Sequence, residues 1–471
     1  MSTLVTLSKP GRPATDELRA PPPIAAARRR KVFVHTFGCQ MNESDSARMV
    51  ELLAGSGFAA TPHADEADLI LLNTCAVREK AEQKLLSALG RYREHKDRRG
   101  AILAVGGCVA QQEKGRLLKR VPYLDFVFGP DQIAKLPEMI ARAVQRERFH
   151  ETGWMDSAEY VFPRADPEAA RGRATAFVTA MKGCDNVCAF CIVPHTRGRE
   201  VSRPYADILA ECSALAQVGV REVTLIGQNV NSYRGGCDFA DLLRRVARLP
   251  ELSRVRFTTS HPHDLSDALV DAFRDEPKVM PHFHLPVQSG SDPVLARMRR
   301  DYGVAEYLER FEKLRAARPD IAVTTDFIVG FPGETDEDFE ASLRLLERAR
   351  FDNSFSFVFS PRPKTLAALK LNEAPEWTEV PRDVAVDRLE RLQDLQRRIS
   401  SERMRDELGR TVEVLVEGAS DRDGERLGRT PQNRVAHFAA SEEAAPAGSV
   451  VRVRITRAGG NSLSGELEAA A

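Results

Sequence analysis

A repeated pattern of apolar and polar positions organises the chain between residues 31 and 148. Each repeat has a short apolar run, a tight polar turn and a stretch in which apolar residues recur with helical spacing. The runs are VFVHTFG, ADLILLN and AILAVGG, and the helical stretches begin near Glu43, Val77 and Gln111. Short β-rich runs that alternate with helices are typical of parallel βαβ units. We therefore predict an N-terminal α/β domain with a parallel sheet over residues 31–148.

A second series of strand and helix patterns follows a linker that we expect over residues 149–169. Its strand candidates are ATAFVTAM, EVTLIG, RVRFTTS, HFHLPV, AVTTDFIVG and SFSFVFS, and helical patterns such as YADILAECSALAQVG separate them. Six βα repeats predict a full or partial parallel barrel over residues 170–402. The active face of such a barrel lies at the C-terminal ends of its strands.

The pattern changes to strict alternation in residues 403–468. VEVLVEG and VVRVRITRA alternate with a period of two and are separated by Gly-rich turns, which predicts a small antiparallel β-barrel. Arg452 and Arg454 share one face of the second strand, and between Arg426 and Arg457 six Arg oppose two Glu. An RNA-binding surface is one interpretation of this pattern, and a solubilising sheet face is the other.

Residues 1–30 are rich in Pro, Ala and Arg, and seven basic side chains oppose two acidic ones between Met1 and Lys31. This composition is typical of a disordered basic tail, either a solvated extension or a segment that touches RNA.

The composition is that of an ordinary globular protein. Of 471 residues, 42% are hydrophobic and 29% are charged, and 68 basic residues balance 68 acidic ones, so total charge indicates no nucleic-acid partner. Because no apolar run reaches the ~18 residues of a spanning helix and no secretory signal is evident, we expect a cytoplasmic protein.

The eight cysteines indicate metal or redox chemistry, because a large cytosolic chain does not need a disulfide framework. Cys39, Cys75 and Cys108 each follow one of the first three apolar runs directly. Residues just beyond the C-terminal ends of parallel strands share one edge of the sheet, so these cysteines can converge. The alternative is that they are three small buried hydrophobic residues.

The stretch KGCDNVCAFC places Cys184, Cys188 and Cys191 in a C-x3-C-x2-C pattern directly after the strand ATAFVTAM. Structural zinc sites and ordinary four-iron clusters take four protein ligands. Three thiolates would hold three irons of a four-iron cluster and leave the fourth iron open to a substrate or cofactor.

These motifs resemble those of the radical S-adenosylmethionine (SAM) methylthiotransferases, over nearly the entire chain. Within that family the chain is most similar to the MiaB type, which modifies N(6)-dimethylallyladenosine in tRNA. The stretches that carry the resemblance are TFGCQMNESDS, NTCAVREKAEQK, TRGREVSRP, LIGQNVNSY, LPVQSGSDPVL, DFIVGFPGETDEDF and GRTPQNR. The C-terminal barrel resembles the RNA-binding TRAM domain.

The resemblance implies two 4Fe-4S clusters. Cys184, Cys188 and Cys191 would hold the catalytic cluster, whose open iron binds SAM, and reductive cleavage of SAM would yield a 5′-deoxyadenosyl radical. Cys39, Cys75 and Cys108 would hold an auxiliary cluster that handles sulfur. One SAM would supply the methyl group, and another would supply the radical that removes hydrogen from C2 of the modified adenine beside the anticodon. Implied partners are tRNA, an electron donor such as flavodoxin or ferredoxin, and a sulfur donor.

Weaker candidates accompany the cysteines. By the same resemblance, Gly227, Gln228 and Asn229 would contact the amino-acid part of SAM, although a strand-ending turn explains them equally well. The turn GFPGET, residues 330–335, permits close approach to a ligand. Four histidines form two H-x-H pairs, and we expect them to orient loops by hydrogen bonding; they are His261, His263, His282 and His284. We expect Cys212 and Cys237 to be free thiols.

The chain departs from the family pattern in two loops. His195 replaces a usual tyrosine, and FSPRPKTLAAL, with Phe359, Lys364 and Leu366, stands where relatives are closer to YSxRPGTPA. The sequence leaves two rival functions open. One is methylthiolation of threonylcarbamoyladenosine in tRNA or of a ribosomal protein. The other is a non-catalytic RNA-binding protein whose cysteines hold structural zinc.

Overall fold

The N-terminal domain is a six-stranded parallel sheet in a computed structural model that describes residues 29–468 apart from 77–79, 157–159, 161 and 163. The strand order is β2-β1-β3-β4-β5-β6. The strands are β1 (Arg30–Thr36), β2 (Phe58–Ala60), β3 (Leu69–Thr74), β4 (Ile102–Gly107), β5 (Phe126–Phe128) and β6 (Phe149–Glu151). The predicted parallel sheet is confirmed. The predicted basic tail lies outside the described residues, except for its last two positions.

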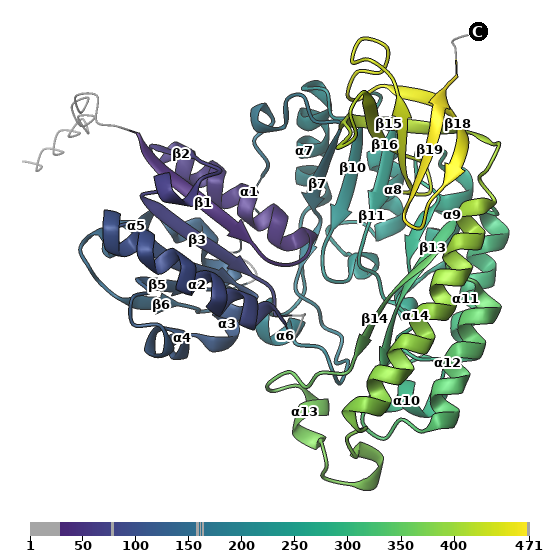
Figure 1. The fold of residues 1–471 in the computed structure, drawn as a ribbon, viewed down its shortest axis with the longest axis horizontal. Coiled ribbons are helices and arrows are strands. Elements are labelled where there is room, and N and C mark those ends of the chain that lie inside the picture. The colour runs from purple at the N-terminus through teal and green to yellow at the C-terminus, as the bar shows by residue number, and fades with distance from the viewer. Residues whose placement is uncertain (1–28, 77–79, 157–159, 161, 163, 469–471) are drawn as a thin grey trace, which may run out of the picture.

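Helices cover both faces of this sheet (Figure 1). One face packs against α1 (Gln40–Gly55) and α5 (Leu136–Val144). The other packs against α2 (Lys80–Arg99), α3 (Cys108–Glu113) and α4 (Gly115–Arg120). All six residues of β3 are buried, as expected for a strand covered on both sides.

The start of the predicted linker differs from the structure. Residues 149–151 form β6, which pairs in parallel with β5 and completes the sheet. This strand is too short for sequence periodicity to reveal, and its only signal is the ladder that forms once β5 is in place.

The central domain is a partial parallel barrel, as predicted. Three strands form one sheet: β7 (Thr175–Thr179), β10 (Glu222–Ile226) and β11 (Arg254–Phe257). Three more form a second sheet: β12 (His282–His284), β13 (Ala322–Val329) and β14 (Asn353–Val358). An isolated parallel bridge between Val255 and Val279 links the two. No ladder joins β7 to β14 within the described chain, so the barrel stays open at these two edges.

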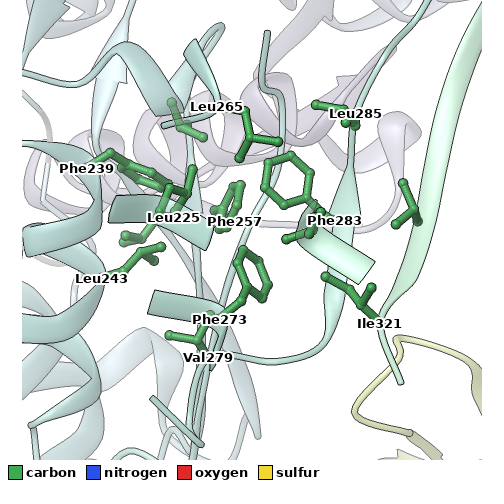
Figure 2. Close-up of a cluster of buried hydrophobic side chains, with 14 of the residues drawn as sticks. Leu225, Phe239, Leu243, Phe257, Leu265, Phe273, Val279, Phe283, Leu285 and Ile321 are labelled. Atoms are coloured by element: carbon green, nitrogen blue, oxygen red, sulfur yellow. The ribbon is translucent and has the colours of Figure 1, made fainter. Parts of the chain in front are cut away.

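Helices form the outer layer of the barrel. They are α7 (Tyr205–Gln217), α8 (Phe239–Ala247), α9 (Asp267–Asp275), α10 (Asp292–Arg297), α11 (Val304–Ala317), α12 (Asp336–Ala349) and α14 (Arg382–Arg405). Phenylalanines fill the space between sheet and helices, and Figure 2 shows the rings of Phe257, Phe273 and Phe283 in contact. Free Cys212 is buried in this core, and free Cys237 is half-buried in a loop.

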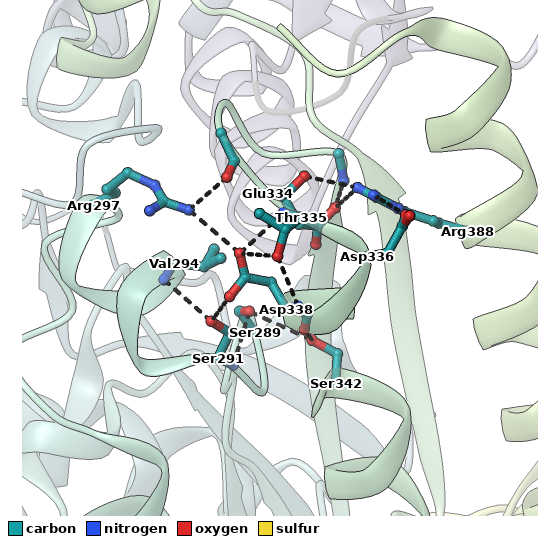
Figure 3. A network of polar contacts seen from close by, with 12 residues as sticks. Ser289, Ser291, Val294, Arg297, Glu334, Thr335, Asp336, Asp338, Ser342 and Arg388 are labelled. Atoms are coloured by element: carbon teal, nitrogen blue, oxygen red, sulfur yellow. Dashed lines mark hydrogen bonds and ion pairs between the residues drawn. The ribbon is translucent and has the colours of Figure 1, made fainter. Parts of the chain in front are cut away.

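The GFPGET turn is a structural clamp (Figure 3). The carboxylate of Glu334 accepts a hydrogen bond from the Gly330 amide at 2.5 Å and pairs with Arg388 of α14 at 2.9 Å. Thr335 and Asp338 form a capping box at the start of α12. A Cβ at Gly333 would lie 2.1 Å from the Glu376 carbonyl oxygen. Close backbone packing therefore accounts for this glycine without a ligand.

The C-terminal domain is a closed five-stranded barrel in the order β15-β16-β17-β19-β18. Its strands are β15 (Thr411–Ala419), β16 (Glu425–Arg429), β17 (Val435–Ala439), β18 (Val450–Ala458) and β19 (Ser462–Leu467). The prediction of an antiparallel barrel was wrong in one respect, because β17 and β19 pair in parallel. Strand directions cannot alternate all the way round a ring of five, so one pair at least must run parallel.

No described helix is both long and apolar enough to cross a membrane.

The loop that departs from the family pattern contains a strained position. Lys364 has φ of 70°, in the left-handed region, just before Thr365 caps the short helix α13 (Leu366–Lys370). Leu366 and Phe359 pack against a small apolar cluster that contains Phe331. His195 lies in the short helix α6 (Val193–Thr196).

We expect Lys364→Gly to raise the free energy of unfolding by about 1 kcal/mol, because glycine adopts positive φ without a steric penalty. Denaturant unfolding measures this change. Lys370→Gly, at the helical end of the same segment, is the matched control and should not stabilise the protein. Equal effects of the two substitutions would contradict the assignment of strain to Lys364.

Candidate functional site

A cavity of about 1040 Å³ occupies the interior of the partial barrel and extends to both flanking domains. The inward faces of the six strands line it, together with Cys39 and Cys75 of the N-terminal domain and Arg429, Gln432 and Asn433 of the C-terminal barrel. Its size exceeds that of typical small-ligand pockets and suits a substrate as large as a nucleoside.

The first cysteine trio follows three adjacent strands of the N-terminal sheet. Cys39 precedes α1, Cys75 follows β3, and Cys108 is the first residue of α3. A hydrogen bond with Cys75 lowers the pKa of Cys39 to about 6, and Arg197 favours the same thiolate. A Cβ at Gly38 would lie 2.5 Å from the Cys75 Cβ. A glycine is therefore required before Cys39 for these two cysteines to approach.

A buried guanidinium lies beside this trio. Arg197 directly follows α6, the short helix that packs against α3. Its Nη2 donates to Asp45 of α1 at 2.7 Å. Its positive charge acts on both Cys39 and Cys108. A second buried pair, Lys182 with Asp131 at 2.6 Å, also joins the two domains. These pairs fix the thiol edge of the sheet against the barrel.

The second trio lies in the loop after β8 (Met181–Lys182). Cys184 is buried, and Cys188 and Cys191 are half-buried. Burial raises the pKa of Cys184 to about 11 and that of Cys191 to about 12, and nearby Cys188 adds a smaller effect. Thiols this weakly acidic form thiolates only beside a compensating positive charge, which a bound metal supplies.

Cys188 has two partners that its sequence spacing does not reveal. Arg300 donates to its Sγ at 3.3 Å, and Nε2 of His261 lies 3.9 Å from the same sulfur. Burial lowers the pKa of His261 far below its ordinary value, so the imidazole stays neutral. Both partners come from loops distant in sequence, which folding alone brings to Cys188.

Among the described residues, no three His, Cys, Asp or Glu side chains form a group that could hold a metal ion. This applies to both cysteine trios as well as to the four histidines of the H-x-H pairs. His261 accepts from the His263 amide, and Nδ1 of His284 lies 2.9 Å from the Thr324 hydroxyl. Burial lowers the pKa of His282 to about 3.

Gly227, Gln228 and Asn229 follow β10 at the same edge as the second trio. The side-chain Oε1 of Gln228 accepts a hydrogen bond from the backbone amide of Gly183, beside Cys184. The side-chain Nδ2 of Asn229 donates to Asp264 at 2.7 Å. The other polar atoms of these two side chains, Nε2 of Gln228 and Oδ1 of Asn229, are buried and lack a hydrogen-bond partner. Unpaired buried polar atoms are costly, and here they provide one donor and one acceptor for a ligand.

The GRTPQNR segment joins the C-terminal barrel to the central domain. Arg256 of β11 pairs with Glu222 at 2.9 Å and donates to the carbonyl oxygens of Thr430 and Pro431. Arg434 pairs with Asp352 at 2.9 Å. The two arginines of the segment are therefore engaged within the protein, since Arg429 also pairs with Glu417.

The outward arginines of β18 are exposed but paired. Arg452 contacts Glu468 at 2.8 Å and Arg454 contacts Glu466 at 2.6 Å. Exposed pairs of this kind contribute little to stability, so they remain available to exchange an internal carboxylate for a phosphate.

Three family models match the chain in succession. Residues 31–129 match Uncharacterized protein family UPF0004, residues 178–346 match the Radical SAM superfamily, and residues 405–467 match the TRAM domain. A tRNA-2-methylthio-N(6)-dimethylallyladenosine synthase from Anaeromyxobacter sp. (strain K) is 76% identical over 99% of this chain and 100% of its own length. The Myxococcus xanthus (strain DK1622) protein of the same name is 63% identical over 93% of this chain and 94% of its own.

The chain belongs to the tRNA-2-methylthio-N(6)-dimethylallyladenosine synthase family. It is a radical SAM methylthiotransferase, so the family predicted from the motifs is confirmed, and the non-catalytic rival function was wrong. Among solved structures, the radical SAM methyltransferase TsrM from Kitasatospora setae has a TM-score of 0.54 at 15% identity, covering 73% of this chain and 74% of its own. That likeness supports the fold alone.

Removing the Arg256 side chain tests the attachment of the C-terminal barrel. We expect Arg256→Ala to lower the free energy of unfolding by about 3–5 kcal/mol, because Glu222 is left buried without its partner. Denaturant unfolding measures the loss, and limited proteolysis should release the barrel. Arg454→Ala, which breaks an exposed pair, should cost at most about 1 kcal/mol. Unchanged resistance of the C-terminal barrel to limited proteolysis would exclude the anchoring role.

Proposed function

We propose that this enzyme converts N(6)-dimethylallyladenosine beside the anticodon of tRNA to its 2-methylthio derivative, with SAM as both methyl donor and radical source. The observation that carries the proposal is that Cys39 and Cys75 line the same cavity as the inward face of the radical SAM barrel. Thiols that handle sulfur and a barrel that aims a radical would thus act on one bound base.

Each trio offers three thiols, the donor type that suits an iron–sulfur cluster, although in the described structure neither trio's side chains are gathered into a metal-holding group. Cys184, Cys188 and Cys191 would hold the cluster that supplies reductive cleavage of SAM, and Cys39, Cys75 and Cys108 would hold an auxiliary one for sulfur insertion. Arg300 would donate to Cys188, and Arg197 would place positive charge beside the auxiliary trio. Hydrogen bonds and charges of this kind tune such clusters.

The SAM site rests on atoms left without partners. The buried amide nitrogen of Gln228 and carbonyl oxygen of Asn229 match the carboxylate and ammonium of an amino acid in sign. A Cβ at Gly227 would lie 2.5 Å from the Met181 side chain, so this residue must be glycine for the loop to pack.

The C-terminal barrel would position the RNA. Its anchored segment carries Gln432 and Asn433 to the rim of the cavity, where their amides can hydrogen-bond nucleotides. The paired arginines Arg452 and Arg454 would add phosphate contacts. A reductant such as flavodoxin or ferredoxin and a separate sulfur donor remain predictions.

The conversion itself is tested by anaerobic incubation of the reconstituted enzyme with SAM, a reductant and dimethylallyl-modified tRNA. We expect 5′-deoxyadenosine together with the 2-methylthio nucleoside, both detected by mass spectrometry. If the enzyme instead modified only tRNA that carries threonylcarbamoyladenosine, the proposed substrate would be wrong and the rival substrate would be supported.

Cysteine variants distinguish the two clusters. We expect about eight irons in the reconstituted protein, and about four in both Cys39→Ala and Cys188→Ala. Cys188→Ala should form neither product, whereas Cys39→Ala should still release 5′-deoxyadenosine. Cys237→Ser is the matched control and should keep all eight irons. Four irons in the unaltered enzyme would contradict the auxiliary cluster.

Asn229→Ala should weaken SAM binding roughly tenfold, because it removes a buried hydrogen-bond acceptor. Equilibrium dialysis with SAM measures the affinity, and iron analysis confirms that the cluster is retained. Unchanged affinity at full iron content would exclude Asn229 from the SAM site.

A further inference from the structure

The most exposed phenylalanines of the described chain gather in one place. Among the described residues, the phenylalanines classed as exposed are Phe177, Phe355 and Phe357, with relative exposures of 37%, 48% and 43%. All three line the barrel cavity. A large apolar side chain left exposed in a concave site indicates a ligand that covers it.

The two strands that carry these rings are the unpaired edges of the barrel. Phe177 lies on β7, and Phe355 and Phe357 lie on β14. Figure 1 shows β7 and β14 as the first and last strands of the curved wall. The rings therefore lie at the two unpaired edges of the barrel, in the cavity that Cys39 and Cys75 also line.

β14 exposes its phenylalanine side chains and covers its serines, the opposite of what is expected for a strand that serves only to pack a core. Its phenylalanines alternate with Ser354 and Ser356, and the serines occupy the more covered face, which is turned toward α14. The serine hydroxyls lie 3.2 Å apart. Burying phenylalanine and exposing serine would stabilise the fold more, so stability does not explain this register.

Within the part of the chain that the structure describes, five arginines line the cavity, and carboxylates hold three of them. These three pairs are Arg256 with Glu222, Arg429 with Glu417 and Arg434 with Asp352. Asp326, on the strand beside β14, lies 3.5 Å from His284.

We propose that Phe355 and Phe357, with Phe177 opposite, form the subsite for the modified base. This subsite binds the dimethylallyl group and one face of the adenine that carries it. This inference rests on the proposed function and names the residues that select its substrate. The five apolar carbons of the dimethylallyl group would be removed from water when they pack against the β14 rings. The adenine base would stack on an aromatic face. The subsite thereby distinguishes prenylated from unmodified adenosine.

The test measures binding without turnover. The cluster-loaded full-length enzyme, kept anaerobic without SAM or reductant, is titrated with two anticodon stem–loop RNAs that differ only in the dimethylallyl group. Burial of the prenyl carbons predicts that the unaltered enzyme binds the prenylated RNA at least tenfold more tightly. Phe355→Ala/Phe357→Ala should reduce this ratio to about threefold or less, mainly by weakening binding of the prenylated RNA.

Further variants distinguish a specific loss of the preference for prenylated RNA from a general loss of folding. Phe355→Leu should keep most of the preference, because leucine preserves apolar contact. Phe177→Ala, on the opposite edge, should lower it. Val144→Ala removes an equally exposed apolar side chain from α5, outside the cavity lining, and should leave the ratio unchanged. Iron content and circular dichroism show whether each variant is folded.

A ratio unchanged in both Phe355→Ala/Phe357→Ala and Phe177→Ala would overturn the proposal. No preference for the prenylated RNA in the unaltered enzyme would also overturn it. Neither result affects the proposed function while the unaltered enzyme still makes the methylthio nucleoside. Absence of that product would instead refute the proposed function.

Discussion

The central barrel is incomplete, and the rest of the structure depends on how its open lumen is closed. β7 and β14 do not pair, so the inward faces of the strands would lie open to solvent. Polar contacts hold the flanking domains over the lumen. On one side Arg197 pairs with Asp45 and Lys182 with Asp131; on the other, Arg256 donates to the carbonyl oxygens of Thr430 and Pro431, and Arg434 pairs with Asp352. Such pairs add little net stability, but they strongly disfavour any misaligned docking, because an unmatched buried charge is costly.

This docking gives the cavity three different walls. The N-terminal sheet contributes thiols, the barrel contributes a polar inner face with aromatic edges, and the C-terminal barrel contributes amides at the rim. The two flanking domains contribute residues from loops and strand ends, whereas the central barrel contributes the inward faces of its strands. Reactive groups can therefore sit on rigid elements without weakening the cores behind them.

Local irregularities divide into structural and functional ones. The GFPGET turn and its capping box hold α12 and α14 in place, although Oε1 of Glu334 is itself buried without a hydrogen-bond partner. The unpaired atoms of Gln228 and Asn229 and the cavity-facing rings of β14 have no such internal explanation. Polar atoms buried without partners and apolar rings left exposed carry a free-energy cost, which a bound substrate or cofactor can offset.

The amino-acid sequence by itself determined the three domains, the parallel sheets and the positions of both cysteine trios, because periodicity and spacing are local properties. It could not show β6, whose three residues depend on β5, or the parallel pair in the C-terminal barrel, which follows from closing five strands. Nor could it show that Arg300 reaches Cys188 across 112 positions or that GRTPQNR anchors a domain. These contacts arise between segments far apart in the chain, and only the tertiary structure decides which buried charges meet.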